Sequence, residues 1–500
     1  MNAPPVFSTA QIRAIEERAA AGLAGPTLMQ RAGLATARAA RELATDTGAP
    51  ILVVAGPGNN GGDAWVAAAH LREGFHRVTV LEVAGTGPRA PEAREARERF
   101  GRLGGEIVRE WPAPLRPALV LDGLLGIGLA RDVEGELAAL VDRINGCGSP
   151  VLSIDIPSGV ASDTGRIRGR AVRATRTITF IARKTGLYTG PALDCTGEIE
   201  VDDLGIDPAL LEGTRGCLLT PDSVRGLLAR RARDTHKGSF GTLGIVGGGK
   251  GMAGAPILAA RAGLLAGAGK VFVGLIAAEA PAFDPAWPEL MLRKVDDVLR
   301  ADAIVAGPGA GHSPNASSIS AFERTTLPSI LALRKPVVLD ADALNAVAVH
   351  ESLRKALTDE RTFPVVLPPH PAEAARLLRT GVEDIQADRL AAALSLASWF
   401  RAEVVLKGAG SICASPDGTW AINTTGNPGL AAGGTGDVLA GMIGALLCQG
   451  LPAREALRYG VCLHGAAADS LVARGVGPVG ITASEVALEA RTVLNRWIAG

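Results

Sequence analysis

Polar side chains follow three apolar segments in the first half of the chain, within "GPGNNGGD", "LDGLLGIG" and "SIDIPSG". The residues that could do chemistry there are Asn59, Asn60, Asp63, Asp122, Asp155 and Ser158. Parallel strands expose their carboxyl ends on one edge of a sheet, so these turns are expected to meet. Amide, carboxylate and hydroxyl oxygens are ligands for a hard cation. The pattern allows Asn60, Asp122 and Ser158 to share one cation while Asp155 faces a substrate.

The first turn also spells the Gly-x-Gly-x-x-Gly of a dinucleotide-binding turn, with Gly56, Gly58 and Gly61 in the three places. Glu82 stands near the position at which such proteins place an acid for the ribose. Asp63 argues against this interpretation, because its charge would repel a pyrophosphate in the bend. A plainer alternative for each acid of the three turns is that it caps the helix that follows.

The second half contains "GLAAGGTGDVLAG", in which glycines precede Asp437 and an apolar helical run. Backbone amides at a helix start bind anions, and a carboxylate beside them could deprotonate a hydroxyl next to a phosphate. The alternative is that Asp437 only caps the helix. Lys407 ends the strand pattern "EVVLK", and His370 ends "FPVVLPPH", where it is either a substrate contact or a structural histidine. "GIVGGGKG" nearly matches a Walker loop, but Gly251 replaces the metal-binding Ser or Thr, which excludes that interpretation.

Alternating strand and helix patterns must position these turns, and they run through both halves of the 500-residue chain. Strands predicted at 51–55, 77–83 and 118–126 alternate with helices, and the same alternation resumes with a strand at 242–246. This pattern indicates two α/β domains, each with a doubly wound, mainly parallel sheet. We place the boundary at residue 218, which gives domains 1–217 and 218–500.

The composition excludes several classes of function. The formal net charge is zero, which gives no electrostatic argument for nucleic acid or for an anionic membrane surface. The most apolar run follows Asp437 and is shorter than a membrane span. The six cysteines lie far apart without a C-x-x-C pair, so neither a disulfide framework nor a zinc site is expected. No signal peptide is visible. These features predict a soluble cytoplasmic protein.

The stretches "GPGNNGGDA", "LDGLLGIGLARD" and "SIDIPSG" resemble the signatures of the NAD(P)H-hydrate epimerase family, over about the first 215 residues. The resemblance implies a Rossmann-like three-layer sandwich that exchanges the R and S forms of hydrated NADH or NADPH. It also implies a potassium ion on Asn60, Asp122 and Ser158, and we expect Asp155 to transfer the proton because inversion needs a positioned acid/base. The implied substrate contacts are Asn59, Asn60, Gly61, Gly62, Asp63, Gly126, Ile127, Gly128, Leu129, Ala130, Arg131, Asp132 and Asp155. Ala64 stands where many members have Gly.

Residues 225–500 resemble the ADP-dependent NAD(P)H-hydrate dehydratase of the ribokinase-like superfamily, through "LPPHPAE", "LKGAGS" and "NPGLAAGGTGDVLAG". The resemblance implies an α/β/α domain that removes water from the S form while ADP, the co-substrate, is split, and Mg²⁺ is expected with the nucleotide. Asp437 would activate the hydroxyl that leaves. The implied nucleotide contacts are Lys407, Gly408, Ala409, Gly410, Ser411 and Gly436, and the implied substrate contacts are Ala255, Gly311, His370 and Asp437. Ser411 stands where Thr is usual and keeps the hydroxyl.

Both halves therefore predict one enzyme with two sites that repairs hydrated NADH and NADPH and forms a homo-oligomer. The enzymatic alternative is a vitamin or sugar kinase of the ribokinase-like superfamily, fused to a nucleotide-binding domain. A binding protein whose first half has lost catalysis is a second alternative, and an NAD-dependent oxidoreductase is the last. ADP or ATP as the nucleotide, and NADH-hydrate or NADPH-hydrate as the preferred substrate, remain open.

Overall fold

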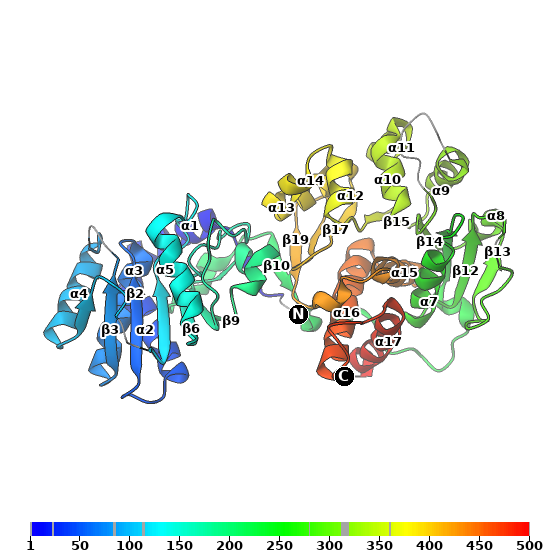
Figure 1. Cartoon of the computed structure of the whole chain (residues 1–500). Coiled ribbons are helices and arrows are strands. Elements are labelled where there is room, and N and C mark those ends of the chain that lie inside the picture. The colour runs from blue at the N-terminus through cyan, green and yellow to red at the C-terminus, as the bar shows by residue number, and fades with distance from the viewer. Residues whose placement is uncertain are drawn as a thin grey trace. The chain divides into compact units, whose positions relative to one another are not determined.

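The computed structural model describes residues 3–22, 25–83, 87–112, 116–279, 281–311, 320–359 and 362–499 (Figure 1). The chain divides into two compact units, Pro5–Thr214 and Arg215–Gly500, and Met1–Pro4 belongs with the second. The predicted boundary at residue 218 falls inside strand β10 (Gly216–Leu219). Every residue of β10 pairs with β19 (Trp420–Asn423) of the second unit. The division therefore lies just before β10 rather than within it.

The first unit is built on a seven-stranded sheet whose neighbouring strands are all parallel. Across the sheet the strands are β4 (Glu106–Val108), β3 (Arg77–Glu82), β2 (Pro50–Ala55), β5 (Leu119–Gly123), β6 (Val151–Ile154), β7 (Arg176–Phe180) and β9 (Glu198–Asp202). The strand order reverses between β2 and β5. Doubly wound sheets bind ligands beyond the carboxyl ends of the strands at such a reversal. The site residues predicted in this half come from β5 itself and from the segments after β2, β5 and β6.

Helices cover both faces of this sheet. They are α2 (Leu28–Leu43), α3 (Asn59–Glu73), α4 (Pro91–Arg102) and α5 (Gly135–Gly146). In β2, Ile51 and Val53 are buried in a core shared with α2, α3 and α4, whereas Leu52 and Val54 are buried in a core shared with α5. Successive residues of a strand point to opposite faces, so a strand covered on both sides is apolar throughout. The predicted doubly wound three-layer sandwich is confirmed.

The start of the first unit adds a strand and a helix that the sequence analysis did not predict. Strand β1 (Pro5–Phe7) pairs in parallel with the short strand β8 (Arg183–Lys184), and Phe7 lies opposite Lys184. Helix α1 (Thr9–Gly22) follows and buries Ile12 and Ile15 in the core that α2 and α3 share. Strand β1 therefore places the first residues of the unit beside Arg183–Lys184, which lie far along the chain.

The second unit has its own mainly parallel sheet. Its strands, in order, are β13 (Met291–Arg293), β12 (Lys270–Leu275), β11 (Thr242–Gly247), β14 (Ala303–Ala306), β15 (Val337–Leu339), β16 (Val365–Leu367), β17 (Glu403–Leu406), β18 (Ile412–Ala414), β19 and β10. Among the described strands of this sheet, β17–β18 and β18–β19 are the pairs that run antiparallel. The order reverses between β11 and β14, which marks the crevice expected to bind ligands. The Walker-like glycine Gly244 lies inside β11 rather than in a loop, which agrees with the rejection of that motif.

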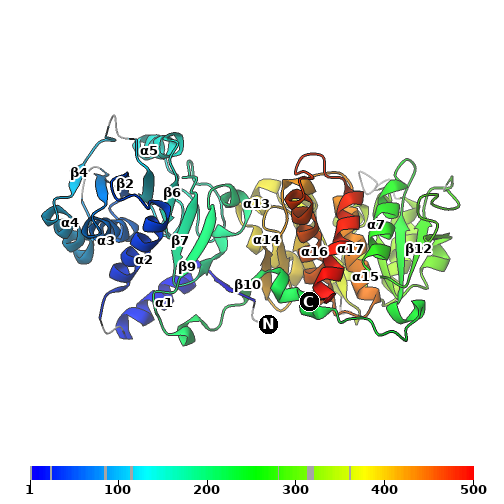
Figure 2. The same ribbon diagram turned by 90° about the horizontal axis from the view of Figure 1, so that it is seen from below.

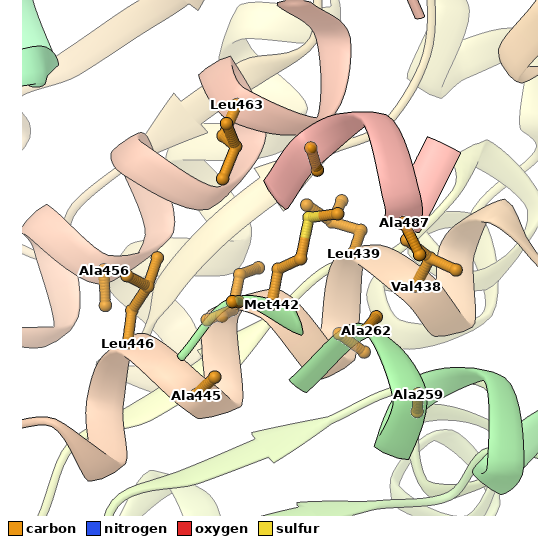
Figure 3. Close-up of a cluster of buried hydrophobic side chains, with 14 of the residues drawn as sticks. Ala259, Ala262, Val438, Leu439, Met442, Ala445, Leu446, Ala456, Leu463 and Ala487 are labelled. Atoms are coloured by element: carbon orange, nitrogen blue, oxygen red, sulfur yellow. The ribbon is translucent and has the colours of Figure 1, made fainter. Parts of the chain in front are cut away.

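Helices pack on both faces of the second sheet as well. Figure 2 shows α7 (Gly254–Leu265), α15 (Thr435–Cys448), α16 (Ala453–Ala473) and α17 (Ala483–Ala499) side by side. In Figure 3, Leu439 and Met442 of α15 lie among side chains of α7, α16 and α17. On the other face lie α10 (Asp342–Val349), α11 (Glu351–Thr358), α12 (Pro371–Leu378) and α14 (Arg389–Phe400) (Figure 1). The predicted second α/β/α domain is confirmed.

Burial inside this domain explains the apolar run that follows Asp437. Nearly every residue of α15 is buried, and a helix that is apolar all round is typical of a protein core. Among the described residues, no helix is long and apolar enough to cross a membrane.

Candidate functional site

Glycines after β2 allow two loops of the first unit to touch through their backbones. A Cβ atom on Gly56 would lie 2.0 Å from the carbonyl oxygen of Leu124, and one on Gly61 would lie 1.8 Å from the carbonyl oxygen of Gly56. This close approach by itself explains the Gly-x-Gly-x-x-Gly spacing. Glu82, the expected ribose acid of the dinucleotide interpretation, is bound instead by Arg97 at 2.6 and 3.2 Å. The turn therefore brings two strand ends together. Glu82, the acid that would bind a cofactor ribose, is held in an ion pair with Arg97.

The predicted cation ligands Asn60, Asp122 and Ser158 converge on Leu125. Asn60 Nδ2 donates to the carbonyl oxygen of Leu125 at 2.7 Å. The Leu125 amide donates to Ser158 Oγ at 2.8 Å. Ser158 in turn donates from its hydroxyl to Asp122 Oδ1 at 2.6 Å and from its amide to Asp122 Oδ2 at 2.9 Å. Three segments far apart in sequence thus meet at one point of the sheet edge.

The groups at this point fit a hard cation. Asn60 Oδ1 is buried and has no hydrogen-bond partner, which is uncommon for a buried amide oxygen. Asp122 accepts four hydrogen bonds, which occupy about four acceptor positions of a carboxylate. Burial raises the pKa of Asp122, and its hydrogen bonds, first those from Ser158, oppose that effect. Asp122 therefore orients Ser158, and Asn60 Oδ1 is the oxygen of this cluster that has no hydrogen-bond partner.

Asp155 lies beyond the end of β6 with a left-handed backbone, at φ 64°. Its Oδ1 accepts from Lys184 Nζ at 2.5 Å, and from the Thr179 hydroxyl and the Phe180 amide at 3.4 Å. No helix lies between β6 and β7, so the alternative in which Asp155 caps a helix is wrong. Asp122 lies inside β5 and caps no helix either. Lys184 was missed by the sequence analysis, because no spacing in "FIARKTG" distinguishes it.

Two further acids surround this pair. Asp63 is buried in α3, and burial, followed by the charges of Asp155 and Glu16, raises its pKa well above the usual value, with Lys184 opposing. Burial and the charge of Asp155 also raise the pKa of Glu16. Glu16 belongs to α1, so its presence depends on the docking of a helix that the sequence analysis did not predict. The first site is therefore an acidic cluster with one buried lysine.

The predicted substrate loop, Gly126–Asp132, begins beside the same cluster. A Cβ atom on Gly126 would lie 3.1 Å from the Cβ atom of Asn60. Further along, Arg168 donates from Nη2 to the Ala130 carbonyl oxygen at 2.8 Å and pairs with Asp132 at 3.1 Å. The middle of the loop passes α1, since a Cβ atom on Gly128 would lie 3.6 Å from Arg13 Nη2. The loop is thus fixed at its start and near its end. Ile127 and Leu129 pack partly into the cores, and Arg131 is exposed.

In the second unit, the glycine turn before α15 places Asp437 within the helix. Gly434 is the N-cap residue, with φ 88°, and the helix starts at Thr435. The alternative in which Asp437 caps the helix is therefore wrong. Burial, then the charge of Asp340, raises the pKa of Asp437 to about 7, and Lys407 acts in the opposite direction. A carboxylate in this state is suited to accept a proton near neutral pH.

Lys407 lies at the centre of this second cluster. Its Nζ is 3.4 Å from Asp340 Oδ1 and 3.9 Å from Glu373 Oε2, and it is 3.3 Å from where a Cβ atom on Gly436 would be. Burial lowers the pKa of Lys407, but Asp340 and then Glu373 outweigh burial and leave it raised. Burial raises the pKa of Glu373 to about 7. The lysine therefore carries a positive charge to the glycine turn.

Asp340 and Glu373 were missed, although Asp340 ends the strand pattern "VVLD" in the same way that Asp122 ends "LVLD". Its neighbour Asp342 accepts from the amide of Gly311 at 2.9 Å and acts on the pKa of Asp437. Ala255, at the start of α7, would lie 3.2 Å from a Cβ atom on Gly309. Of the predicted substrate contacts, Gly311 thus lies on the loop after β14 and Ala255 in the helix that follows β11, at the reversal of strand order.

His370 has a structural role in the geometry observed. It is the N-cap residue of α12, and its Nδ1 accepts from the amides of Ala372 and Glu373 at 3.2 and 3.4 Å. Burial and the neighbouring Lys407 lower the pKa of His370. Its imidazole is half-exposed, and its other ring nitrogen, Nε2, lies 3.3 Å from Glu373 Oε1.

Arg389, which the sequence analysis also missed, contacts the backbone of the predicted nucleotide loop after β17. Arg389 Nη2 lies 3.3 Å from the carbonyl oxygens of Leu406 and Lys407. Gly408 has φ 140°, and a Cβ atom there would lie 2.9 Å from the Arg389 guanidinium. Ser411 donates from its hydroxyl to the Gly408 carbonyl oxygen at 2.9 Å, so this hydroxyl shapes the loop. Ala409 and Gly410 complete the turn. Within the described ranges, no group of three or more His, Cys, Asp or Glu could hold a metal ion.

Both units match families of known proteins. Residues 25–186 match a family described as YjeF-related protein N-terminus, and residues 243–487 match the NAD(P)H-hydrate dehydratase family. A solved structure of the ADP/ATP-dependent NAD(P)H-hydrate dehydratase from Bacillus subtilis, co-crystallised with ATP and Mg²⁺, is 31% identical and has a TM-score of 0.49. The match covers 56% of this chain and 98% of that one.

Relatives with both parts match over nearly their whole length. The bifunctional NAD(P)H-hydrate repair enzyme Nnr of Escherichia coli (strain K12) is 38% identical, over 96% of this chain and 92% of the relative. The enzymes of the same name from Thermofilum pendens and Coxiella burnetii are 38% and 36% identical, over 95% and 98% of this chain and 94% and 99% of the relatives. The chain therefore belongs to the family of bifunctional NAD(P)H-hydrate repair enzymes.

Proposed function

We propose that the first unit exchanges the R and S forms of hydrated NADH and NADPH, and that the second unit dehydrates the S form at the expense of ADP. The observation that carries the proposal is an aspartate beside a lysine at the carboxyl edge of each sheet: Asp155 pairs with the buried Lys184, and the partly exposed Lys407 acts on the pKa of Asp437. A dehydratase restricted to one epimer leaves the other behind, so the two activities complement each other on one chain.

In the first site, we assign substrate contacts to Asn59–Asp63 and Gly126–Asp132. Inversion of the hydroxyl-bearing carbon requires that the hydroxyl leaves as water with an added proton, and that water returns to the other face and gives one up. Asp155 gives this proton to the leaving hydroxyl and takes one back from the returning water, so no proton is gained or lost over one inversion. Asn60 and Ser158, oriented by Asp122, would hold a potassium ion, which when bound supplies a fixed positive charge at the base of the site. The orphaned Asn60 Oδ1 supports this assignment.

In the second site, Asp437 takes the proton of the substrate hydroxyl as that oxygen bonds to the terminal phosphorus of ADP, whose bond to the bridging oxygen breaks and releases AMP. A phosphate is a better leaving group than hydroxide, so it departs with the electrons of the carbon–oxygen bond, and loss of a proton from the neighbouring carbon to water restores the double bond. Amides at the start of α15, with Lys407 beside Gly436, stabilise the phosphoryl charge. The loop from Lys407 to Ser411 binds the nucleotide, whose phosphates Mg²⁺ would partly neutralise. Ala255, Gly311 and His370 contact the substrate.

Recovery of the reduced nicotinamide tests this assignment. The purified full chain, given mixed hydrate epimers, ADP and Mg²⁺, should restore the full near-ultraviolet absorbance of NADH. Asp155→Asn should stop near half of that recovery, and Asp437→Asn should give none. Absence of recovery by the intact chain with ADP or with ATP would contradict the proposal.

Three further assignments belong to the same proposal. The chain acts in the cytoplasm, it forms a homo-oligomer, and its partners are small molecules. Light scattering of the purified chain measures the oligomeric state. The kinase alternative is not favoured, since relatives matched along the whole chain are repair enzymes. Phosphorylated pyridoxal accumulating with the intact chain would revive it.

A further inference from the structure

Lys184 is a buried ammonium group with all of its donors engaged by the protein. Its side chain is 1% exposed. Nζ donates to Asp155 Oδ1 at 2.5 Å, to the Thr179 hydroxyl at 2.7 Å and to the Phe180 carbonyl oxygen at 2.8 Å. A lysine ammonium has three hydrogens and no acceptor. Lys184 therefore has no donor left for a substrate, and it can affect the chemistry only through Asp155.

The hydrogen bonds to Asp155 fall on one oxygen. Lys184, Thr179 and the amide of Phe180 all approach Oδ1. Within the part of the chain that the structure describes, no donor is recorded for Oδ2. The carboxylate is therefore held by one oxygen and presents the other. The left-handed backbone at Asp155 makes this anchoring necessary, because surrounding contacts must hold a residue in that conformation.

Charges from three elements face Asp155. Lys184 comes from β8, Asp63 from α3, and Glu16 from α1, with Arg13 on the outer side of the same helix. The acids outnumber the buried cation, and mutual repulsion favours a proton on one of them. Lys184 contacts only Asp155 among these acids, so the buried ion pair is made with that carboxylate alone.

We propose that Lys184 is the positioning residue of the epimerase site: it anchors Asp155 through Oδ1 and directs Oδ2 toward the substrate. The inference rests on the proposed epimerase function. It also gives β1 a part in catalysis, because β1 pairs with the strand that carries Lys184. The matched family region, residues 25–186, contains Lys184 but neither β1 nor α1.

Epimerase kinetics of the full chain carrying Lys184→Met test the inference. The epimerase kcat should fall about 100-fold, in the lower range for loss of a positioned acid/base, while KM changes less than about threefold. Dehydration of purified S epimer by the same preparation measures the second unit and should stay at the wild-type rate.

Arg183→Met is the matched control, since it removes a positive charge from the adjacent residue of β8, which does not contact Asp155. It should leave the epimerase kcat and KM unchanged. Thr179→Val keeps the charge of Lys184 but removes one acceptor of Nζ, and it should lower kcat about tenfold with little change of KM.

Each outcome distinguishes the inference from the proposed function. A wild-type chain without epimerase activity overturns the proposed function. An active wild type with a Lys184→Met variant of equal kcat, or of reduced kcat with a KM raised by a similar factor, overturns the inference. If Lys184→Met fails to fold, Thr179→Val decides, and a wild-type kcat in that variant overturns the inference.

Discussion

Asp340 offers the sharpest test of how the second site works, because it acts on Asp437 without being the proposed base. Asp340 is 2% exposed and lies 3.4 Å from Lys407 Nζ. After burial, its charge is the largest cause that raises the pKa of Asp437. Asp340→Asn removes that charge with little change of volume. The pKa of Asp437 should therefore fall.

The size of the effect follows from the pKa of about 7 for Asp437. A base with this pKa is about one tenth ionised at pH 6 and about nine tenths at pH 8, so the dehydratase rate should rise about tenfold between them. Removing a like charge lowers a carboxyl pKa by about one unit. In Asp340→Asn the same rise should therefore shrink to about twofold, because about half of Asp437 is already ionised at pH 6.

The assay is the initial rate on purified S epimer with saturating nucleotide, from pH 5.5 to pH 8.5. Glu373→Gln is the control, because the pKa of Glu373 is also raised to about 7 but Glu373 is not among the causes for Asp437. That variant should keep the acidic limb in place. If the acidic limb of the pH–rate profile stays fixed or moves upward in Asp340→Asn, the reasoning is refuted. If the limb disappears in Glu373→Gln, Glu373 rather than Asp437 is the group that causes it.

Three further outcomes concern the first unit. Gly61→Ala places Cβ 1.8 Å from the Gly56 carbonyl oxygen, so the free energy of unfolding should fall by at least about 1–3 kcal/mol, measured in urea. Asp122→Asn places amide hydrogens opposite groups that donate to the carboxylate, so the free energy of unfolding should fall by about 3 kcal/mol in the same measurement. An unchanged urea midpoint would contradict the hydrogen bonds described. Asn60→Leu should make the epimerase rate equal in potassium chloride and choline chloride, whereas the wild type should be faster in potassium.

The sequence predicts most strands and the meeting of their turns, because both depend on local pattern and on one rule of parallel sheets. Asn60, Asp122 and Ser158 come together for that reason. Asp340 obeys the same rule and was within reach, since it too ends an apolar strand. The helix start at Thr435 was harder, because a run of glycines leaves several equivalent places for an N-cap.

Other parts of the sites depend on tertiary packing that no local pattern encodes. Glu16 enters the first site because α1 docks on the core, and Arg389 meets the nucleotide loop because α14 packs against β17 and β18. His370 is the opposite case, in which the sequence predicted the position of the residue but not its role. Its place at a strand end was predicted correctly, but capping of α12 already accounts for its ring nitrogen, so position alone does not assign chemistry.

The pairing of strand β1 has a consequence for folding during synthesis on the ribosome. Its partner segment follows about 178 residues later, the separation between Phe7 and Thr185 that a hydrogen bond bridges. A ribosome adds about 5–20 residues per second, so the first strand waits on the order of ten seconds or more before that segment is made. Contacts of such span form late in folding. The pairing of β1 with β8 is therefore completed only after β2 to β7 have been made, and a chain truncated before residue 183 would leave β1 without this partner.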